Sequence, residues 1–456
     1  HEPSARMAAI EPPRLAICGT NCRLPGRVNE MATLGSAVSA AYDMVFEVPA
    51  SRWYAGDSPA GLELDVTRRI GYGGFVDAAQ LFDHGTFHMS HAEASATDPQ
   101  QRLVLEHGYA AFHAMGSHRG VLLGSGAGVA VGIYATEFAH ILAQSPLGRS
   151  VYASANALSV ACGRVSFVLG MHGPCASFET ACSASLVACH SAARALQHRE
   201  CDTHLVIGIN LMLLQASSIG MAIAGMTSPT GRSHTFDSRA DGFARGEGAS
   251  AFAMSRSSCG ADPGMRGSAV RQDGRSASLT APNGQAQQQV LRAALSDADM
   301  TVDETALNEA HGTGTKLGDP IEAGSLAAAI LATRRDDNAL AFSSVKGNLG
   351  HGESTAGVTG LLTLAHGLER GRAAPNPQLR SLNPHVGSAL RSRTLVLPTQ
   401  LADLPAVPNA GGVSSFGYSG TIAHAVLRRA AGDGMLPALV AQLVCRRIAL
   451  PWLDAA

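Results

Sequence analysis

The sequence predicts an α/β protein whose sheets are largely buried. Short apolar runs recur along the chain and alternate with Ala- and Leu-rich stretches of helical length. The runs are continuous and do not alternate with polar residues, as is typical of strands covered on both faces. With 50 glycines, 46% hydrophobic residues and only 5% aromatic residues, the composition also favours closely packed helices and strands joined by tight turns.

The elements follow one another from residue 15 onward. The first expected strand is 15–17, which runs into Gly19. Further strands are expected at 128–133, 205–209, 249–254, 340–345, 395–397 and 423–427. Helices are expected at 183–198, 287–297 and 321–333. At 456 residues, the chain is long enough for one large domain or two intimately packed ones.

Both ends differ in composition from the body. Residues 1–12 are expected to be a Pro-containing lead-in, and the start at His1 suggests a segment cut from a longer polypeptide or a trimmed chain. The composition changes after residue 427, and an apolar stretch follows at 435–444. That stretch is either a short helix that docks on the body or a connector to a domain absent from this chain. We treat 429–456 as a C-terminal linker.

Charge and targeting signals exclude several classes of protein. The net charge of -2 and the pI near 6.8 give no electrostatic footprint for nucleic acid or an anionic membrane, although a local basic patch stays possible. No stretch approaches the ~18 to 20 apolar residues of a transmembrane segment. The N-terminus has no apolar core of a secretory signal. We therefore expect an intracellular protein, in the cytoplasm or a plastid.

The nine cysteines show no paired CxxC arrangement, and we expect reduced thiols. Cys18 and Cys22 are four apart but have no second pair of ligands nearby, so no metal site is expected there.

Cys182 stands at the strongest local signal, ETACSASLVA (179–188). A short strand is expected to turn abruptly into an Ala-rich helix at this cysteine. A thiol at a helix N-terminus faces free backbone N–H groups and the positive end of the helix dipole, which predicts a lowered thiol pKa. The same N–H groups can bind an oxyanion after the sulfur attacks a thioester. Most buried cysteines are inert packing residues. The neighbours of Cys182, however, include Thr180, Ser183 and Ser185, small polar residues that suit a crowded turn better than an apolar interior.

Two histidines follow expected strands in glycine-rich loops. They are His311 in EAHGTGTKLGDPIE (309–322) and His351 in SVKGNLGHGE (344–353). Catalytic side chains are often displayed in such loops. We expect the residues from Asp319 to begin a helix, with a capping side chain and Pro320 in its first turn.

These motifs resemble a known family, the β-ketoacyl synthases, and specifically the ketosynthase domains of type I modular polyketide synthases. The cysteine segment is similar to the family signature DTACSSSLVA, and the other two segments resemble its histidine motifs. The likeness continues in chain order through residues 14–26, 98–102, 236–248, 267–284 and 412–427.

The resemblance implies a thiolase-like fold of two similar halves, at 13–265 and 266–428, in a five-layered α/β/α/β/α arrangement, usually as a homodimer. It also implies a decarboxylative Claisen condensation. Cys182 takes an acyl group from the phosphopantetheine arm of an acyl carrier protein, and the enolate from a malonyl carrier then attacks the thioester. Malonyl loading must come from an acyltransferase in trans or from other synthase domains in a longer parent chain. No bound cofactor is expected, since the substrates arrive on the phosphopantetheine arm, and no GxGxxG followed by an acidic residue suggests NADPH.

The family assigns roles to matching residues. His311 and His351 stabilise the enolate, Lys346 orients and polarises that region, and Thr313 and Thr315 hold the pantetheine arm. The backbone N–H groups of Cys182 and Tyr418 form the oxyanion hole.

Four positions depart from the family pattern. They are Glu179 for Asp, Ala184 for Ser, Tyr418 for Phe and Ile422 for Asn. We expect altered rate or chain selectivity, since the cysteine and both histidines are present.

Two alternatives stay open: a related acyl-transfer enzyme, such as a thiolase or a synthase that starts chains from an acyl-CoA, and a catalytically silent domain that binds an acyl chain or a carrier protein. The paired histidines disfavour the first alternative.

Overall fold

The computed structural model describes residues 15–53, 61–146, 156–256, 263–335, 339–390, 395–405, 407, 409–429 and 443–452. Each strand expected from an apolar run is present within these ranges, and so are the three expected helices.

The first half of the chain builds a five-stranded sheet. Its order is β1 (Leu15–Arg23), β8 (Gly248–Ser255), β7 (Thr203–Asn210), β5 (Gly128–Ile133) and β6 (Cys175–Phe178). β1 and β7 each run antiparallel to β8, whereas β7, β5 and β6 are parallel to one another.

The second half repeats this topology. Its order is β9 (Gly264–Gln272), β16 (Thr421–Arg428), β15 (Ala410–Phe416), β10 (Thr305–Glu309) and β11 (Leu340–Ser343), with β13 (Leu395–Val396) added at the edge. The sequence of two antiparallel pairs followed by parallel pairs is the same as in the first half. β1 pairs with β9 through Leu15 and Met265, which joins the halves into one 11-stranded sheet.

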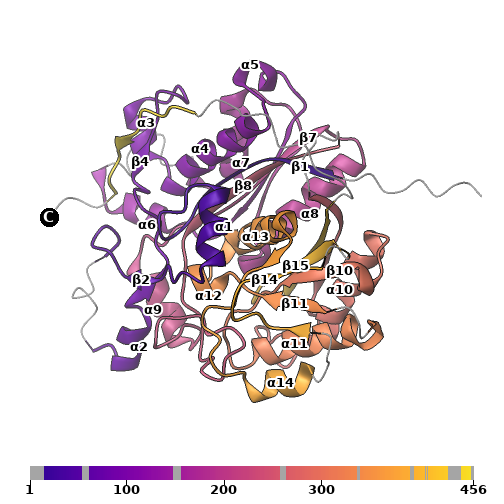
Figure 1. The fold of residues 1–456 in the computed structure, drawn as a ribbon. Helices are drawn as coiled ribbons and strands as arrows, with labels where there is room; N and C mark the ends of the chain where they lie inside the picture. Colours follow the sequence, from indigo (N-terminus) through magenta and orange to yellow (C-terminus); the bar gives the residue numbers. More distant parts are fainter. Residues whose placement is uncertain are drawn as a thin grey trace, which may run out of the picture.

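Helices form three layers around the two halves of the sheet (Figure 1). α8 (Ala184–Gln197) and α13 (Ala356–Arg370) lie between the halves and share one hydrophobic core with strands of both. The outer helices are α4 (Pro99–Ala114) and α7 (Leu158–Leu169) on the first half, and α10 (Gly284–Asp297) and α11 (Gly318–Ala329) on the second. The predicted α/β fold with two similar halves in five layers is therefore confirmed.

Shorter elements fill the periphery and the loops. The helices are α1 (Met31–Ser39), α2 (Leu64–Arg69), α3 (His91–Ala96), α5 (Arg119–Leu122), α6 (Glu137–Ala143), α9 (Gln215–Ile223), α12 (Lys346–Leu349) and α14 (Pro384–Leu390). The 3₁₀ turns are η4 (Ala181–Ser183), η5 (Val302–Glu304), η6 (Leu331–Thr333) and η7 (Glu353–Thr355). The strands are β2 (Phe46–Glu47), β3 (Tyr72–Gly73), β4 (Leu81–Phe82), β12 (Arg372–Ala373), β14 (Ala402–Asp403) and β17 (Ile448–Ala449).

Burial and capping explain the main elements. Every residue of β5 and β8 is buried, as continuous apolar runs predict. Asp98 caps α4 by accepting the N–H of Gln100, and Asn283 caps α10 in the same manner. The expected cap of α11 was wrong: the helix begins at Gly318, and the Asp319 carboxylate accepts the N–H of Phe236, far along the chain, and that of Gly314 in the preceding loop.

The last described residues pack on the first half of the chain. Ile448 and Ala449 pair with β4, and Leu450 is buried. Arg447 forms an ion pair with the buried Glu106 at 2.9 Å. The lead-in at 1–12 lies outside the described residues, as does most of the apolar stretch at 435–444.

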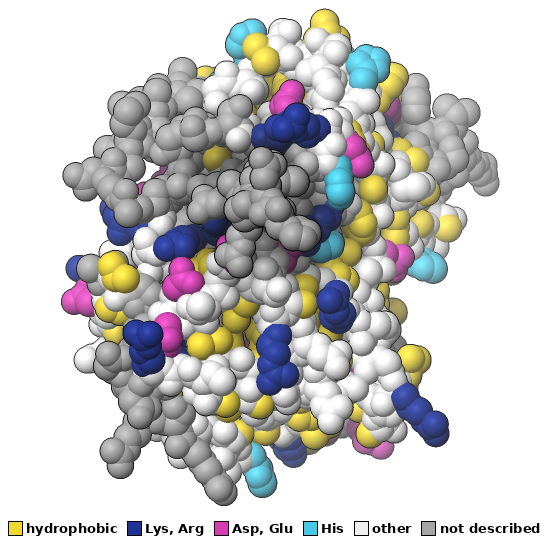
Figure 2. Space-filling model, turned by 90° about the vertical axis from the view of Figure 1, so that its right-hand side faces the viewer, with side chains coloured by type: hydrophobic (Ala, Val, Ile, Leu, Met, Phe, Trp, Pro, Cys, Tyr) yellow, Lys and Arg dark blue, Asp and Glu magenta, His cyan; other side chains and the backbone are white. Residues whose placement is uncertain are grey.

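The surface and the cysteines add three findings. On the face seen in Figure 2, described basic side chains are interspersed with acidic and uncharged ones. None of the described helices has the length and apolar character to cross a membrane.

Cys18 is disulfide-bonded, so the expectation of reduced thiols was wrong at this residue. The spacing of cysteines along the chain does not show which sulfur atoms lie close together in the fold.

Candidate active site

Cys182 lies in η4, between the end of β6 and the start of α8. The preceding residue, Ala181, has a φ of 52°, a left-handed conformation that costs a non-glycine residue about 1–3 kcal/mol. The Ser415 hydroxyl donates a hydrogen bond to the Cys182 carbonyl at 2.7 Å and ties this turn to β15. The sharp strand-to-helix turn expected at Cys182 is therefore present and is held from the second half of the molecule.

Gly417 allows the loop after β15 to approach the cysteine turn closely. A Cβ at this position would meet the Thr180 carbonyl oxygen at 2.5 Å. The following residue, Tyr418, thereby places its backbone N–H beside the Cys182 thiol. The two amides expected to form an oxyanion hole, those of Cys182 and Tyr418, both lie next to the sulfur.

The expected lowering of the Cys182 pKa was wrong. Burial and the negative charge of Glu353 raise the pKa of the thiol to about 12. Lys346 and the two backbone N–H groups oppose this rise but do not overcome it. The helix N-terminus contributes less than the loss of water around a thiolate costs.

His311 and His351 lie next to each other, with ring centroids 5.4 Å apart. The Nδ1 atom of His311 accepts the Phe416 N–H at 3.3 Å, and the Nδ1 atom of His351 accepts the Glu353 N–H at the same distance. A neutral imidazole whose Nδ1 accepts carries its proton on Nε2. Both rings therefore present an Nε2–H donor.

Both histidines are neutral near pH 7. Burial, followed by the nearby positive charge of Lys346, holds the pKa of each ring well below its usual value. The Nε2 atom of His351 is buried and has no hydrogen-bond partner among the described residues. An unpartnered buried donor is costly, and a substrate oxygen would satisfy it.

Lys346 lies buried behind the histidines, where burial lowers the pKa of its ammonium. The negative charges of Glu309, Glu322 and Asp319 favour its charged form. Glu322 also accepts the backbone N–H groups of His311 and Gly312 at 2.7 and 2.8 Å, which fixes the first histidine loop. Burial raises the pKa of Glu322 to about 7.

A buried ion pair helps to orient His351. Glu353 binds Arg245 at 2.6 Å, and both side chains are almost fully buried. Arg245 also donates to the Ser218 hydroxyl at 2.7 Å. The backbone N–H of Glu353 donates to Nδ1 of His351. By fixing the position of Glu353, the ion pair therefore favours the tautomer of His351 that carries its proton on Nε2.

The cysteine and the two histidines line one cavity of about 440 Å³, here called the catalytic cavity. Cys182, His311 and His351 lie in its wall together with Thr313 and Thr315, whose hydroxyl oxygens are 3.3 Å apart. Gly314, between the two threonines, has a φ of 76°, which glycine adopts without strain. The structure thus brings together the predicted nucleophile, the two histidines and the two threonines.

Tyr418 extends along the catalytic cavity toward Tyr134, and their hydroxyl oxygens are 3.5 Å apart. Two of the other departures from the family pattern lie in the interior. Ala184 is a buried residue at the start of α8, and Ile422 is fully buried in the core around α10. Glu179 is exposed.

Sequence reasoning missed the groups that orient the site. Glu309 and Glu322 stand inside the quoted histidine motif, but nothing in the sequence shows that their carboxyls interact electrostatically with Lys346. Arg245 and Glu353 are 108 residues apart. The signal in the sequence was weak, because Arg245 stands in a segment with four other charged residues and nothing marks it as the partner of Glu353.

Comparison with known proteins decides the family. The family model "Beta-ketoacyl synthase, N-terminal domain" matches residues 13–259, and "Beta-ketoacyl synthase, C-terminal domain" matches residues 264–380. The chain belongs to the β-ketoacyl synthase family. Ketosynthases of this family are acyltransferases that join acyl units by Claisen condensation, and the predicted family is confirmed.

Relatives of this ketosynthase are parts of long polyketide synthases. A phenolphthiocerol/phthiocerol polyketide synthase from Mycobacterium tuberculosis is 38% identical over 95% of the chain, which covers 24% of that protein. "Polyketide synthase GfsA" from Streptomyces halstedii is 38% identical over 99% of the chain, which covers 6% of that protein. The chain therefore spans a quarter or less of either relative.

Solved structures agree on the fold of the ketosynthase. A ketosynthase from module 6 of the bacillaene synthase of Bacillus subtilis has a TM-score of 0.85 at 31% identity, covering 92% of this chain and 72% of that one. A domain of the oxazolomycin synthase of Streptomyces albus has a TM-score of 0.85 at 28% identity, covering 92% and 76%. The thiolase-like fold is thereby shown.

Proposed function

We propose that this ketosynthase elongates a polyketide chain and that Cys182 carries the growing acyl group. The observation that carries the proposal is the convergence of Cys182 with two Nε2–H donors in one cavity. In the first step the thiol attacks an acyl thioester. The backbone N–H groups of Cys182 and Tyr418 receive the carbonyl oxygen as it becomes negative.

In the second step His311 and His351 stabilise an enolate. A malonyl thioester loses carbon dioxide, and its negative charge moves to the thioester oxygen. Two neutral Nε2–H donors in a buried site bind that oxygen more strongly than they would in water. Lys346 acts through the two rings by keeping them neutral.

The substrates reach the site on the phosphopantetheine arm of an acyl carrier protein, held by Thr313 and Thr315. Two hydroxyls at the wall of the catalytic cavity suit the amide groups of such an arm. Because the relatives are multidomain synthases, we propose that carrier, acyltransferase and other domains act with this chain, in one polypeptide or in trans.

We also propose a homodimer and a bacterial cytoplasm. Among the described strands β6 pairs only with β5, and its first two residues are exposed, so this sheet edge is available to a second copy. The relatives named above are bacterial, which supports a bacterial cytoplasm over a plastid.

The test is intact-protein mass spectrometry after incubation with a butanoyl carrier-protein thioester. We expect one butanoyl adduct on the protein, absent in Cys182→Ala and retained in the matched control Cys445→Ala, since Cys445 is a free, partly exposed thiol outside the catalytic cavity. Malonyl carrier protein is then added, and a β-keto product on the carrier is expected.

Each outcome decides between the alternatives. An adduct that persists in Cys182→Ala overturns the assignment of the nucleophile. An adduct on Cys182 without any β-keto product identifies a domain that only binds or transfers acyl groups.

A further inference from the structure

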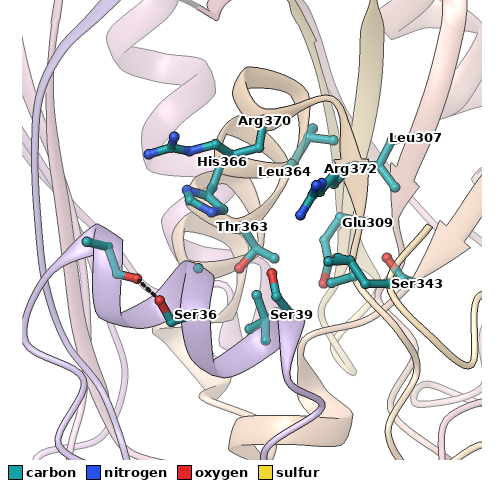
Figure 3. A pocket seen from close by; sticks show the side chains of 16 residues that line it. Ser36, Ser39, Leu307, Glu309, Ser343, Thr363, Leu364, His366, Arg370 and Arg372 are labelled. Carbon is teal, nitrogen blue, oxygen red and sulfur yellow. Dashed lines mark hydrogen bonds between the residues drawn. The ribbon is translucent and has the colours of Figure 1, made fainter. Parts of the chain in front are cut away.

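The proposed function requires a place for the acyl chain that Cys182 carries. When Thr313 and Thr315 hold the pantetheine arm of the malonyl carrier, the chain cannot lie along their side of the catalytic cavity. A second cavity, of about 540 Å³, lies between α1, α13 and β10, and charged side chains such as Arg370 and Arg372 line it (Figure 3). Its described lining shares no residue with the catalytic cavity. The acyl chain therefore belongs along the remaining wall of the catalytic cavity.

That wall combines apolar side chains with two hydroxyls. Met221, Met226 and Phe243 suit a hydrocarbon chain. The hydroxyls are those of Tyr134 and Tyr418, whose oxygens are 3.5 Å apart. A few polar groups in a largely apolar pocket fix the orientation of a ligand and give specificity. The two tyrosines can therefore distinguish one acyl chain from another.

Tyr418 is held beside the reacting carbon by a tight turn between β15 and β16. Its backbone N–H lies next to the Cys182 sulfur. The Gly420 N–H donates to the Gly417 carbonyl at 2.9 Å, and Gly420 has a φ of 89°, which glycine adopts without strain. The Tyr418 side chain extends from this turn, so its hydroxyl lies farther along the acyl chain than the thioester carbonyl.

Tyr134 is fixed from the first half of the molecule. It follows β5, the parallel neighbour of the strand that leads to Cys182. The next residue, Ala135, has a φ of 66°, and its carbonyl accepts a hydrogen bond from the buried Gln100 amide at 3.2 Å. Burial, followed by the hydrogen bond with Tyr418, raises the pKa of Tyr134, so its hydroxyl keeps the proton that it can donate.

The two hydroxyls are too far apart to satisfy each other well. Strong O–H···O bonds span about 2.5–3.0 Å, which is shorter than the 3.5 Å between these oxygens. Each hydroxyl can donate one hydrogen bond and accept others. A third hydroxyl beside the pair can accept from one tyrosine and donate to the other. A substrate hydroxyl would therefore complete a ring of three hydrogen bonds, whereas a saturated chain would not.

The condensation itself determines where an acyl chain carries oxygen. Its product has a keto oxygen on the β-carbon, and hydride reduction of that group leaves a β-hydroxyl. One further condensation moves the hydroxyl to the δ-carbon. Chains that have been elongated and reduced once at a carbonyl therefore carry hydroxyls at these two positions.

Resting on the proposed function, we propose that Tyr134 and Tyr418 select acyl chains with a hydroxyl on the β- or δ-carbon over saturated chains. The class of reaction that supplies this substrate is then the reduction of a β-keto thioester to a β-hydroxy thioester.

The test is a competition for Cys182. Equal amounts of hexanoyl and β-hydroxyhexanoyl carrier-protein thioesters are offered together, and intact-protein mass spectrometry at early times gives the ratio of the two adducts, which differ by one oxygen atom. A second competition uses the δ-hydroxyhexanoyl thioester. We expect the wild type to favour the hydroxyacyl thioester in at least one competition by about tenfold, as one or two added hydrogen bonds allow.

Tyr134→Phe and Tyr418→Phe each keep the aromatic ring and lose the hydroxyl. In both variants we expect the adduct ratio to fall to near one. Tyr42→Phe, at an exposed tyrosine outside the catalytic cavity, is the matched control and should keep the wild-type ratio. Because the two thioesters compete in one sample, a general change in acylation rate does not alter the ratio.

Each result decides the question. A wild-type ratio near one in both competitions would overturn the selection of hydroxyacyl chains and leave the proposed function standing. A preference that persists in Tyr134→Phe or in Tyr418→Phe would also overturn it. Absence of adducts from every thioester would instead refute the proposed function, and the selection with it.

Discussion

His311 and His351 owe their chemistry to the backbone around them. Each ring accepts a backbone N–H at Nδ1, from Phe416 and Glu353 respectively, and so each must donate from Nε2. Donors of this kind stabilise negative charge that develops during a reaction without being consumed. Cys182 does not depend on such donors to react as a thiol. The loading and condensing steps should therefore be separable by substitution.

We expect His351→Ala to abolish condensation while Cys182 still becomes acylated. Loss of one donor to a developing oxyanion costs roughly 10² to 10³ in rate. The rates to compare are release of carbon dioxide from malonyl carrier protein and appearance of the butanoyl adduct by mass spectrometry. His385→Ala, at an exposed histidine, is the matched control. Equal loss of both rates in His351→Ala would show that the ring also serves acyl loading.

At the scale of elements, the site forms where the parallel strands of both halves end. Cys182 follows β6, His311 follows β10, and the Lys346 helix follows β11. The two central helices, α8 and α13, both begin at the site. Cys182 belongs to the first half, and His311 and His351 belong to the second. The contact between the loop after β15 and the cysteine turn therefore sets the position of the Cys182 sulfur relative to the two rings.

Gly417→Ala should disturb that contact. Its Cβ would lie 2.5 Å from the Thr180 carbonyl oxygen, which is backbone and cannot rotate away. We expect a destabilisation of about 1–3 kcal/mol and a clear loss of acylation rate, because the turn that holds Cys182 must shift. Urea denaturation and adduct formation measure the two effects.

Gly163→Ala is the control for this substitution. Gly163 lies inside α7, and a Cβ there meets open space. Alanine is a better helix former than glycine by about 1 kcal/mol, so this variant should be as stable as the wild type or more stable. An unchanged acylation rate in Gly417→Ala would mean that the β15 loop does not position the cysteine turn.

Hydrophobic pattern predicted the strands that are buried on both faces, such as β5 and β8, since burial requires continuous apolar runs. α4 was missed because it is buried nearly all round and yet contains Gln100, Arg102 and Glu106. Their polar groups find partners far along the chain, as Arg102 does at the Leu450 carbonyl. A residue pattern cannot show such partners. The same limit hid the carboxyls that interact with Lys346. Cys182 and the two histidines could be singled out as candidates because each stands in its own local motif.

At the scale of the whole molecule, many titratable groups are buried within one continuous core. Burial lowers the pKa of His107 and His424 to about 3 and that of His204 to about 4. Burial also raises the pKa of acids, as for Asp98 and Asp319, each to about 6. The two sets act in opposite directions on stability. The buried acids stabilise the fold as pH falls below about 6, and the buried histidines destabilise it as pH falls below about 6.5.

His424 isolates the histidine contribution. It lies fully buried in β16, and its Nδ1 atom is 3.0 Å from the Ser414 hydroxyl oxygen. Because its pKa is lower in the folded state, its contribution to stability is complete above about pH 6.5 and is lost progressively toward pH 3. The loss is about 1.4 kcal/mol per pH unit, or about 2 kcal/mol between pH 6.5 and 5. His424→Gln removes the titrating group.

We expect the free energy of unfolding of His424→Gln to fall by about 2 kcal/mol less than that of the wild type between pH 6.5 and 5. Urea denaturation of both proteins at the two pH values measures the difference. His385→Gln, at an exposed position, should follow the wild type. Parallel loss of stability in His424→Gln and the wild type would mean that His424 becomes charged inside the fold without cost, contrary to its burial.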